Sequence, residues 1–143
     1  MSLTIEKCLQ AWTNSLKQMK AKVDIVFLGD SLIYNGDFAS VYPDKVVCNL
    51  GLRGDTLLGM KNRVEQVKLP KPKRVYLMAG VNDVASKTAV EFRKQYKSLI
   101  KTQIEQISTT ELIDFNMLPV NDADFKISCN NAQIKACNEE IKK

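Results

Sequence analysis

The chain has 143 residues, of which 45% are hydrophobic and 26% are charged, and its formal net charge is +5. This length suits one domain with a single core, and the composition excludes extended disorder. The basic excess does not indicate a nucleic-acid partner, because the mild lysine cluster around Lys68, Lys71, Lys73 and Arg74 lacks interleaved aromatic residues and any recognition motif. We interpret this cluster as a solvated face and expect a single domain over residues 1–143.

The cysteines and the N-terminus limit the cellular setting and the cofactors. No C-x-x-C pair occurs among Cys8, Cys48, Cys129 and Cys137, and the sequence contains no histidine. We therefore expect reduced thiols, no metal site and no organic cofactor. The N-terminus lacks the apolar core of a signal peptide, and no run reaches the roughly 18 apolar residues of a membrane helix. These features predict a cytoplasmic protein without a membrane span.

The first half of the chain predicts two helices and two strands. Residues 4–20 should form an amphipathic helix, because apolar residues recur at helical spacing at Ile5, Cys8, Leu9, Trp12, Leu16 and Met19. Val23–Leu28 is a compact apolar run that ends at glycine, as a strand buried on both faces does. A short strand is expected at Val46–Cys48, and a helix at Leu57–Val67 that the following prolines end.

The second half repeats the alternation. Arg74–Ala79 reads as a strand, and a long helix begins near Ser86 or Thr88 and carries an apolar face as far as Ile107. Glu111–Leu118 should be the next strand, and residues 128–142 the last helix. Strands that alternate with helices along the whole chain predict an α/β fold, with a parallel sheet between two helical layers in a three-layer α/β/α sandwich.

Three turns rich in glycine and small polar residues follow predicted strands, at Gly29–Ser31, Gly51–Thr56 and Gly80–Asp83. Ligands of such sheets collect at the carboxyl ends of the strands, where these turns would meet. A serine at a helix start, a glycine backbone N–H and an asparagine amide can supply a nucleophile and oxyanion donors. For any single turn, a capping residue and a tight glycine turn are the better explanation.

The three turns together resemble a known family. "GDSL" at residues 29–32, "NLGLRGDT" at 49–56 and "GVND" at 80–83 resemble, in order and approximate spacing, the first three motif blocks of the GDSL or SGNH hydrolases. With "MLPVN" at 117–121, they look most like bacterial lysophospholipase-like esterases and the catalytic subunits of platelet-activating-factor acetylhydrolase. The resemblance implies a flavodoxin-like fold and a serine esterase that hydrolyses acetyl or short acyl esters, lysophospholipids or acetylated sugars.

The resemblance also implies roles for individual residues. Ser31 would attack the ester carbonyl, and the backbone N–H groups of Ser31 and Gly54 and the side-chain amide of Asn82 would form the oxyanion hole. Gly54 fits better than Gly51, because the donor glycine of the family is followed by Asp-Thr. The aspartates beside Ser31 and Asn82 are expected to order their turns.

The chain departs from the family pattern in one respect. The family supplies the histidine base and its carboxylate partner from a C-terminal Asp-x-x-His block, and this sequence has no histidine. We favour a C-terminally incomplete domain that lacks the last strand; the alternative is a catalytically inactive binding or structural module. A base drawn from Asp37, Asp122 or Asp124 is the weakest explanation, because a carboxylate with a pKa near 4 is a weak base toward a hydroxyl.

Two further expectations concern the strand at Glu111–Leu118. Without another strand beside it, its edge would be exposed and would invite pairing with a second copy of the chain, which predicts a homodimer or poor solubility. Asp114 interrupts its apolar run. Because a buried unpaired carboxylate is costly, we expect Asp114 to face water.

Overall fold

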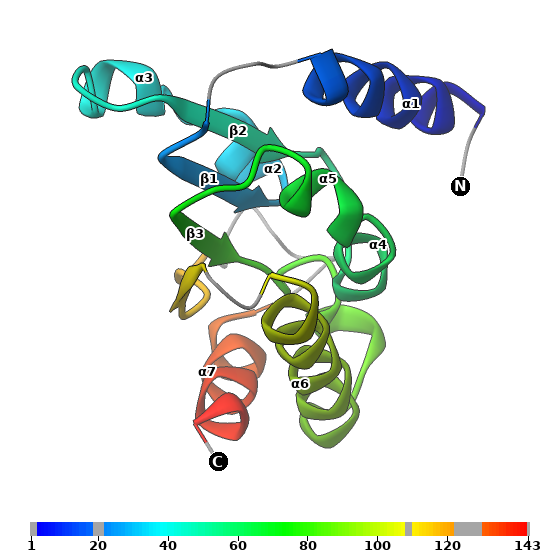
Figure 1. Ribbon diagram of the computed structural model, residues 1–143. Coiled ribbons are helices and arrows are strands. Elements are labelled where there is room, and N and C mark those ends of the chain that lie inside the picture. The colour runs from blue at the N-terminus through cyan, green and yellow to red at the C-terminus, as the bar shows by residue number, and fades with distance from the viewer. Residues whose placement is uncertain (1–2, 19–21, 108–109, 122–129, 143) are drawn as a thin grey trace.

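The computed structural model describes residues 3–18, 22–107, 110–121 and 130–142 (Figure 1). The elements follow one another in the order α1 (Leu3–Gln18), β1 (Ile25–Gly29), α2 (Ser31–Tyr34), α3 (Phe38–Val41), β2 (Val47–Gly51), α4 (Leu57–Asn62), α5 (Val64–Lys68), β3 (Arg74–Met78), the 3-10 turn η1 (Val84–Ser86), α6 (Ala89–Gln106), β4 (Glu111–Phe115) and α7 (Asn131–Ile141).

The described strands form one parallel sheet in the order β2-β1-β3-β4. In its register, Gly29 at the end of β1 lies opposite Gly51 of β2 and Met78 of β3. The three strands therefore end level with one another, and the turns that follow them start from the same edge. The predicted α/β fold with a parallel sheet is confirmed.

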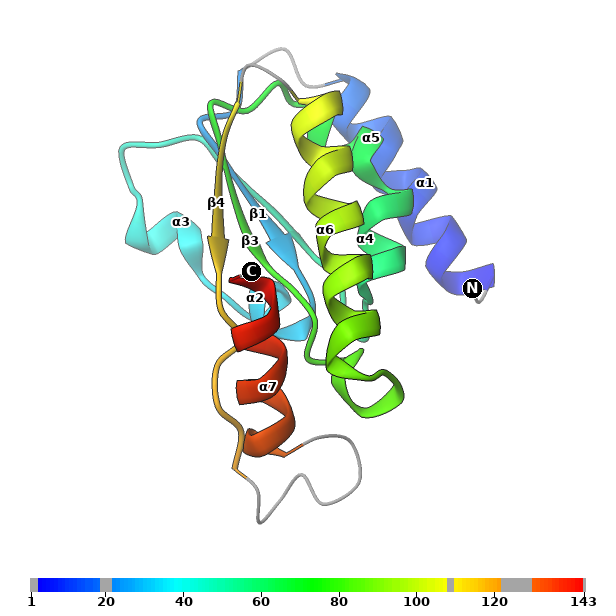
Figure 2. The same ribbon diagram turned by 90° about the horizontal axis from the view of Figure 1, so that it is seen from below.

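Helices cover both faces of the sheet (Figure 2). On one face, α1, α4, α5 and α6 lie over the main core, where the fully buried side chains include Val26, Leu28, Leu57, Met60, Val75, Leu77, Phe92 and Leu99. The other face carries a smaller core under the short helices α2 and α3. A ladder of stacked rings crosses this second face from Phe38 through Phe27 and Tyr76 to Phe115, with centroid separations of 3.7, 5.2 and 5.5 Å.

Several boundaries differ from those that the sequence predicts. The expected helix at 57–67 is divided into α4 and α5 at Arg63, whose backbone angles (φ −111°, ψ 25°) depart from helical values. The second strand runs from Val47 to Gly51 rather than ending at 48, and β4 ends at Phe115 rather than at 118. Met19 and Cys129 lie outside the described residues.

Strand β4 forms one edge of the described sheet, since β3 is its one partner there. Asp114 on this strand is exposed, as expected, but its carboxylate accepts a hydrogen bond from the Tyr96 hydroxyl of α6. Burial raises the pKa of Tyr96, and the charge of Asp114 adds to this effect. Partial loss of water around the carboxylate also raises the pKa of Asp114, although the hydrogen bond from Tyr96 opposes that shift. Asp114 is therefore a partner of α6 at the sheet edge.

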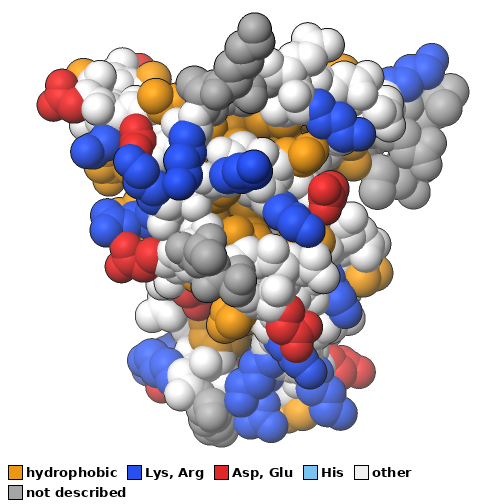
Figure 3. Space-filling view, in the orientation of Figure 1, with side chains coloured by type: hydrophobic (Ala, Val, Ile, Leu, Met, Phe, Trp, Pro, Cys, Tyr) orange, Lys and Arg blue, Asp and Glu red, His pale blue; other side chains and the backbone are white. Residues whose placement is uncertain are grey.

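The basic cluster and the cysteines agree with the expectations from the sequence, a solvated face and reduced thiols. Lysine and arginine side chains crowd parts of the surface in Figure 3, and Lys22, Lys68, Lys71 and Lys73 line an open hollow of about 470 Å³. Lys73 also pairs with Asp24 at 2.7 Å. Cys48 is half-buried and Cys137 buried, and both are free thiols. In the described part of the chain, no helix is long and apolar enough to span a bilayer.

Candidate active site

Ser31 is the first residue of α2 and follows β1 after a single residue, Asp30. The Asp30 side chain caps the helix, because its Oδ1 accepts a hydrogen bond from the Leu32 N–H at 2.9 Å. At the other end of α2, the side-chain amide of Asn49 donates to the Ile33 carbonyl at 2.8 Å. Both ends of the short helix are therefore held, and Ser31 remains half-buried at its start.

The two glycines of the second turn have different surroundings. A Cβ atom on Gly51 would lie 2.1 Å from the backbone nitrogen of Tyr34, so this glycine permits the close approach of α2 to β2. Gly54 has φ +75°, a value that favours glycine, and a Cβ there would meet no atom within 4 Å. Gly54 thus lies at the open tip of the turn, whereas Gly51 lies in its packed base.

The third turn is bound to the second. The Asn82 side-chain amide donates to the Asp55 carbonyl at 2.8 Å. The buried carboxylate of Asp83 accepts from the Leu57 N–H at 3.0 Å and from the Lys87 ammonium at 2.9 Å. Asn82 and Asp83 therefore fix the turn after β3 against the start of α4.

Arg63 also binds these turns. It is a residue that the sequence analysis did not single out. Its side chain is buried, and its guanidinium donates to the Asp55 carboxylate at 2.8 Å and to the carbonyls of Leu50 and Gly29 at 2.8 and 3.3 Å. One side chain thus connects the ends of β1 and β2 with the second turn. Because its acceptors lie on other segments of the chain, the sequence carries no local signal for this role.

Three buried carboxylates lie behind the turns, in Asp30, Asp55 and Asp83. Burial raises the pKa of Asp30, and the charges of Asp55 and Asp83 add to this effect. Burial also raises the pKa of Asp55, although the Arg63 guanidinium opposes that shift. The site is therefore held by ionisable groups that lose hydration in the folded state.

Hydrogen-bond donors remain unpaired at the front of the site. Neither the Ser31 N–H, the Ser31 hydroxyl nor the Gly54 N–H donates to any described residue. Ser31 is half-buried and Gly54 is exposed, so these donors are open to solvent or to a ligand. The arrangement can place a hydroxyl beside backbone donors at the carboxyl edge of the sheet.

A cavity of about 240 Å³ is lined in part by Asp30 and Leu32, the two sequence neighbours of Ser31. Its lining is mainly apolar and consists of Asp30, Leu32, Met78, Ala79, Val81, Met117, Leu118, Pro119, Val120 and Asn121. Ala79 and Met117 are buried, whereas the leucines at 32 and 118 are 49% and 55% exposed. The cavity thus combines buried apolar residues with two exposed leucines in its lining.

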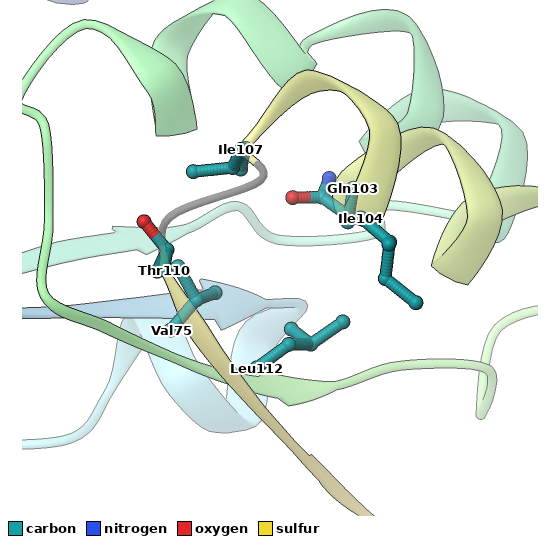
Figure 4. A pocket seen from close by; sticks show the side chains of 6 residues that line it. All are labelled: Val75, Gln103, Ile104, Ile107, Thr110 and Leu112. Carbon is teal, nitrogen blue, oxygen red and sulfur yellow. The ribbon is translucent and has the colours of Figure 1, made fainter.

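A second, smaller cavity of about 50 Å³ lies between α6 and β4 (Figure 4). Gln103 points into it, and its buried amide nitrogen and oxygen have no hydrogen-bond partner among the described residues. The other lining side chains are Val75, Ile104, Ile107, Thr110 and Leu112. A cavity of this size with an unpaired amide can hold a water molecule. Its lining residue Thr110 lies just before the start of β4, at the opposite end of that strand from the edge where the Ser31 turn begins. This cavity is separate from the Ser31 site.

The sequence matches the family model of GDSL-like lipases and acylhydrolases over residues 11–143. The chain belongs to this family. The GDSL-like family match spans all three strand-end turns and the whole sheet. No curated protein matches the chain in sequence.

Solved structures share the fold of this GDSL-like chain at low sequence identity. A Streptococcus pneumonia protein, provisionally named a platelet activating factor, has a TM-score of 0.78 at 19% identity over 94% of this chain and 66% of its own. A GDSL-like lipase from Bacteroides thetaiotaomicron has a TM-score of 0.71 at 19% identity, over 94% and 71%. The OSK domain of Drosophila Oskar has a TM-score of 0.62 at 22% identity, over 90% and 66%. The chain therefore spans about two thirds of the length of these neighbours.

Proposed function

We propose that the chain carries the nucleophile and the oxyanion hole of a serine acylhydrolase that cleaves carboxylic esters. The observation that carries this proposal is the set of unpaired donors at Ser31 and Gly54, which face no described acceptor at the carboxyl edge of the sheet. Membership in the GDSL-like lipase/acylhydrolase family supports it. An oxyanion is the ligand that such a group of N–H donors favours.

In the proposed reaction, the Ser31 oxygen forms a bond to the ester carbonyl carbon while the carbonyl electron pair moves onto oxygen. The N–H groups of Ser31 and Gly54 and the Asn82 amide stabilise this oxyanion. Asn82 has two amide hydrogens, so it can keep its bond to the Asp55 carbonyl and still donate to the oxyanion. When the intermediate collapses, its ester C–O bond breaks, and the base that took the Ser31 proton returns it to the leaving oxygen, which departs as the alcohol. The acyl-enzyme that remains is hydrolysed by water, which restores the Ser31 hydroxyl and releases the acid.

The Ser31 proton needs an acceptor, and these 143 residues contain no histidine. Asp37 does not fit this role well: it caps α3, and its bonds to the Ser40 hydroxyl and N–H lower the pKa of its carboxyl. Asp122 and Asp124 lie outside the described residues. The proposal therefore relies on a base that none of the described side chains provides.

The missing histidine favours a second candidate, a module that binds an ester or a glycan without cleaving it. In that case the same donors would hold a carbonyl or carboxylate oxygen, and Ser31 would act as one more hydrogen-bond donor. The two candidates differ in whether Ser31 forms a covalent bond.

Labelling of Ser31 by a serine-directed fluorophosphonate tests the proposal, with imidazole added as an external base. We expect one adduct, on the peptide that contains Ser31, and faster labelling with imidazole. The Ser40→Ala variant, which removes an exposed serine of α3, should label like the parent, and Ser31→Ala should not label. Asn82→Ala should slow labelling by about 100- to 1000-fold. No labelling of folded protein under any condition would favour the binding module.

A further inference from the structure

Arg53 lies in the tight turn that carries Gly54. The Asp55 N–H donates to the Leu52 carbonyl at 3.1 Å, which closes a β-turn over the two residues between them. The Leu52 N–H in turn donates to the Gly29 carbonyl at the end of β1, at 3.0 Å. The backbone of Arg53 is therefore fixed at the residue before Gly54, whose N–H is a proposed oxyanion donor.

The Arg53 side chain reaches the end of α2, the helix that begins at Ser31. Its guanidinium carbon lies 4.8 Å from the centroid of the Tyr34 ring, which is a cation–π contact. Its Nη2 donates to the Asn35 side-chain oxygen at 3.2 Å. Tyr34 follows Ser31 by three residues, and side chains at this helical spacing are neighbours, with Cβ atoms about 5–6 Å apart. The guanidinium is thus held on the helix of Ser31, about one turn from its hydroxyl.

Arg53 differs from the other arginines of the chain in its partners. Each of the others pairs with a carboxylate: Arg63 with Asp55, Arg74 with Glu111 and Arg93 with Glu140. Arg53 is exposed, and it forms no ion pair with a carboxylate of the described residues. The ring of Tyr34 contacts the face of the guanidinium, so N–H donors at its edge remain available. This edge is the fork that binds carboxylate and phosphate groups through paired hydrogen bonds.

We propose that Arg53 is a specificity-determining residue that selects esters with an anionic group, a carboxylate or a phosphate. Its guanidinium binds the anionic group while the ester carbonyl lies at Ser31 and Gly54. The inference rests on the proposed function for the word ester. Binding of the anionic group itself requires no reaction at Ser31.

The binding test uses the 143-residue chain with nitrogen-15-labelled arginines. The chain is titrated with monomethyl succinate, which presents a carboxylate, with the acetyl ester of glycerol phosphate, and with the neutral methyl butyrate and the cationic acetylcholine as controls. The Nε–H signal of Arg53 should shift with an anionic ester, and high salt should reduce the shift. Arg74, whose Nε donates to Glu111 at 2.7 Å, is the internal control. Equal shifts with all four esters, no shift with either anionic ester, or an equal shift at Arg74 would overturn the inference.

Labelling rates at Ser31 test the selectivity. Two fluorophosphonates that differ in one terminal group, a carboxylate or its methyl ester, should label the parent at rates that differ by about two- to fivefold in favour of the carboxylate. Arg53→Gln should label equally with both, and Arg53→Lys should keep part of the preference, because lysine keeps the charge without the fork. Lys94→Gln removes an exposed charge of α6 and should keep the whole preference. A preference that survives in Arg53→Gln, or one that Lys94→Gln also abolishes, would contradict the role of Arg53.

Ser31→Ala separates this inference from the proposed function. The variant should lose fluorophosphonate labelling and keep the response of Arg53 to anionic esters. Labelling of Ser31 without a charge preference would leave the proposed function standing and remove the role of Arg53. A response of Arg53 without labelling would retain the anion site on a module that binds esters without cleaving them. Because Arg53 is exposed, Arg53→Gln should melt at nearly the temperature of the parent, which shows that the variant is folded.

Discussion

Substitution by alanine should destabilise the protein for different reasons at Gly51 and at Gly54. Alanine at Gly54 finds open space and must only adopt φ +75°, which costs a non-glycine residue about 1–2 kcal/mol. Alanine at Gly51 would place its Cβ 2.1 Å from the Tyr34 nitrogen and must push α2 from β2, at a cost above about 3 kcal/mol. Urea unfolding followed by circular dichroism measures both. Equal losses of stability would show that the base of the turn is not closely packed.

Asp30 should make the stability of the protein depend on pH. Burial raises the pKa of its carboxyl above the ordinary value of 3.8, so the contribution of Asp30 to stability falls as the pH rises from 3.8 through the raised value. An asparagine side chain at this position can still accept from the Leu32 N–H. We therefore expect Asp30→Asn to raise the melting temperature at pH 7 and to leave it unchanged at pH 3, where both forms are neutral.

Asp37→Asn is the matched control, with the opposite sign. Hydrogen bonds from Ser40 lower the pKa of Asp37, so its contribution to stability is present above pH 3.8 and is lost as the pH falls through the lowered value. This variant should melt at a lower temperature than the parent at pH 7. A lower melting temperature for Asp30→Asn at pH 7 would mean that the charge of Asp30 is stabilising.

Sequence reasoning located the turns of Ser31, Gly54 and Asn82 because each follows an apolar run that ends in a glycine-containing turn. It could not find Arg63, whose burial depends on acceptors from three other segments. Two of these acceptors are the carbonyls of Gly29 and Leu50, which lie 34 and 13 residues away. Such a long-range set of partners leaves no local pattern.

Among the elements, α7 holds the cavity wall by its asparagines. Asn138→Ala would leave the Met117 N–H and carbonyl unpaired, which should cost about 1–3 kcal/mol. Amide hydrogen exchange at Met117 should also become faster. Lys135→Ala changes an exposed residue of the same helix and should do neither. Unchanged exchange at Met117 in Asn138→Ala would show that another acceptor replaces the amide.

Among the helices, the long ones follow the sequence pattern, whereas the four-residue helices α2 and α3 were not predicted. The periodic stretches that predict α1, α6 and α7 extend over three turns or more, so their apolar faces are visible in the sequence. Helices α2 and α3 have four residues each, too few to display a period. The division between α4 and α5 follows from the inward turn of Arg63, a tertiary effect.

For the whole molecule, we expect copies of the chain to associate through the edge of the described sheet at β4. Phe115 closes the ring ladder at this edge and is 41% exposed. Pairing of two β4 edges would give a homodimer, as the sequence analysis expects, and a lysine at the edge should oppose it. Sedimentation of the parent should therefore depend on concentration, and Phe115→Lys should reduce self-association. Leu58→Lys, on α4, is the control. A parent that sediments as a monomer at all concentrations would contradict this expectation.

The spacing of the two asparagines along α7 is close to the spacing of their two partner residues in the segment after β4. Asn131 and Asn138 are seven helical residues apart, or about 10.5 Å along the axis, and their partners Val120 and Met117 are three residues apart, a separation that would be about 10 Å in a fully extended backbone. A side-chain amide has an N–H donor and a carbonyl acceptor, as a peptide unit does. The asparagines of α7 therefore pair with the backbone of residues 117 and 120 as the backbone of a neighbouring strand would. One residue inserted between positions 131 and 138 would rotate the second amide by about 100° and uncouple the pair. We therefore expect α7 to tolerate insertions only outside residues 131–138. The segment 117–120 and α7 should move to another scaffold only together.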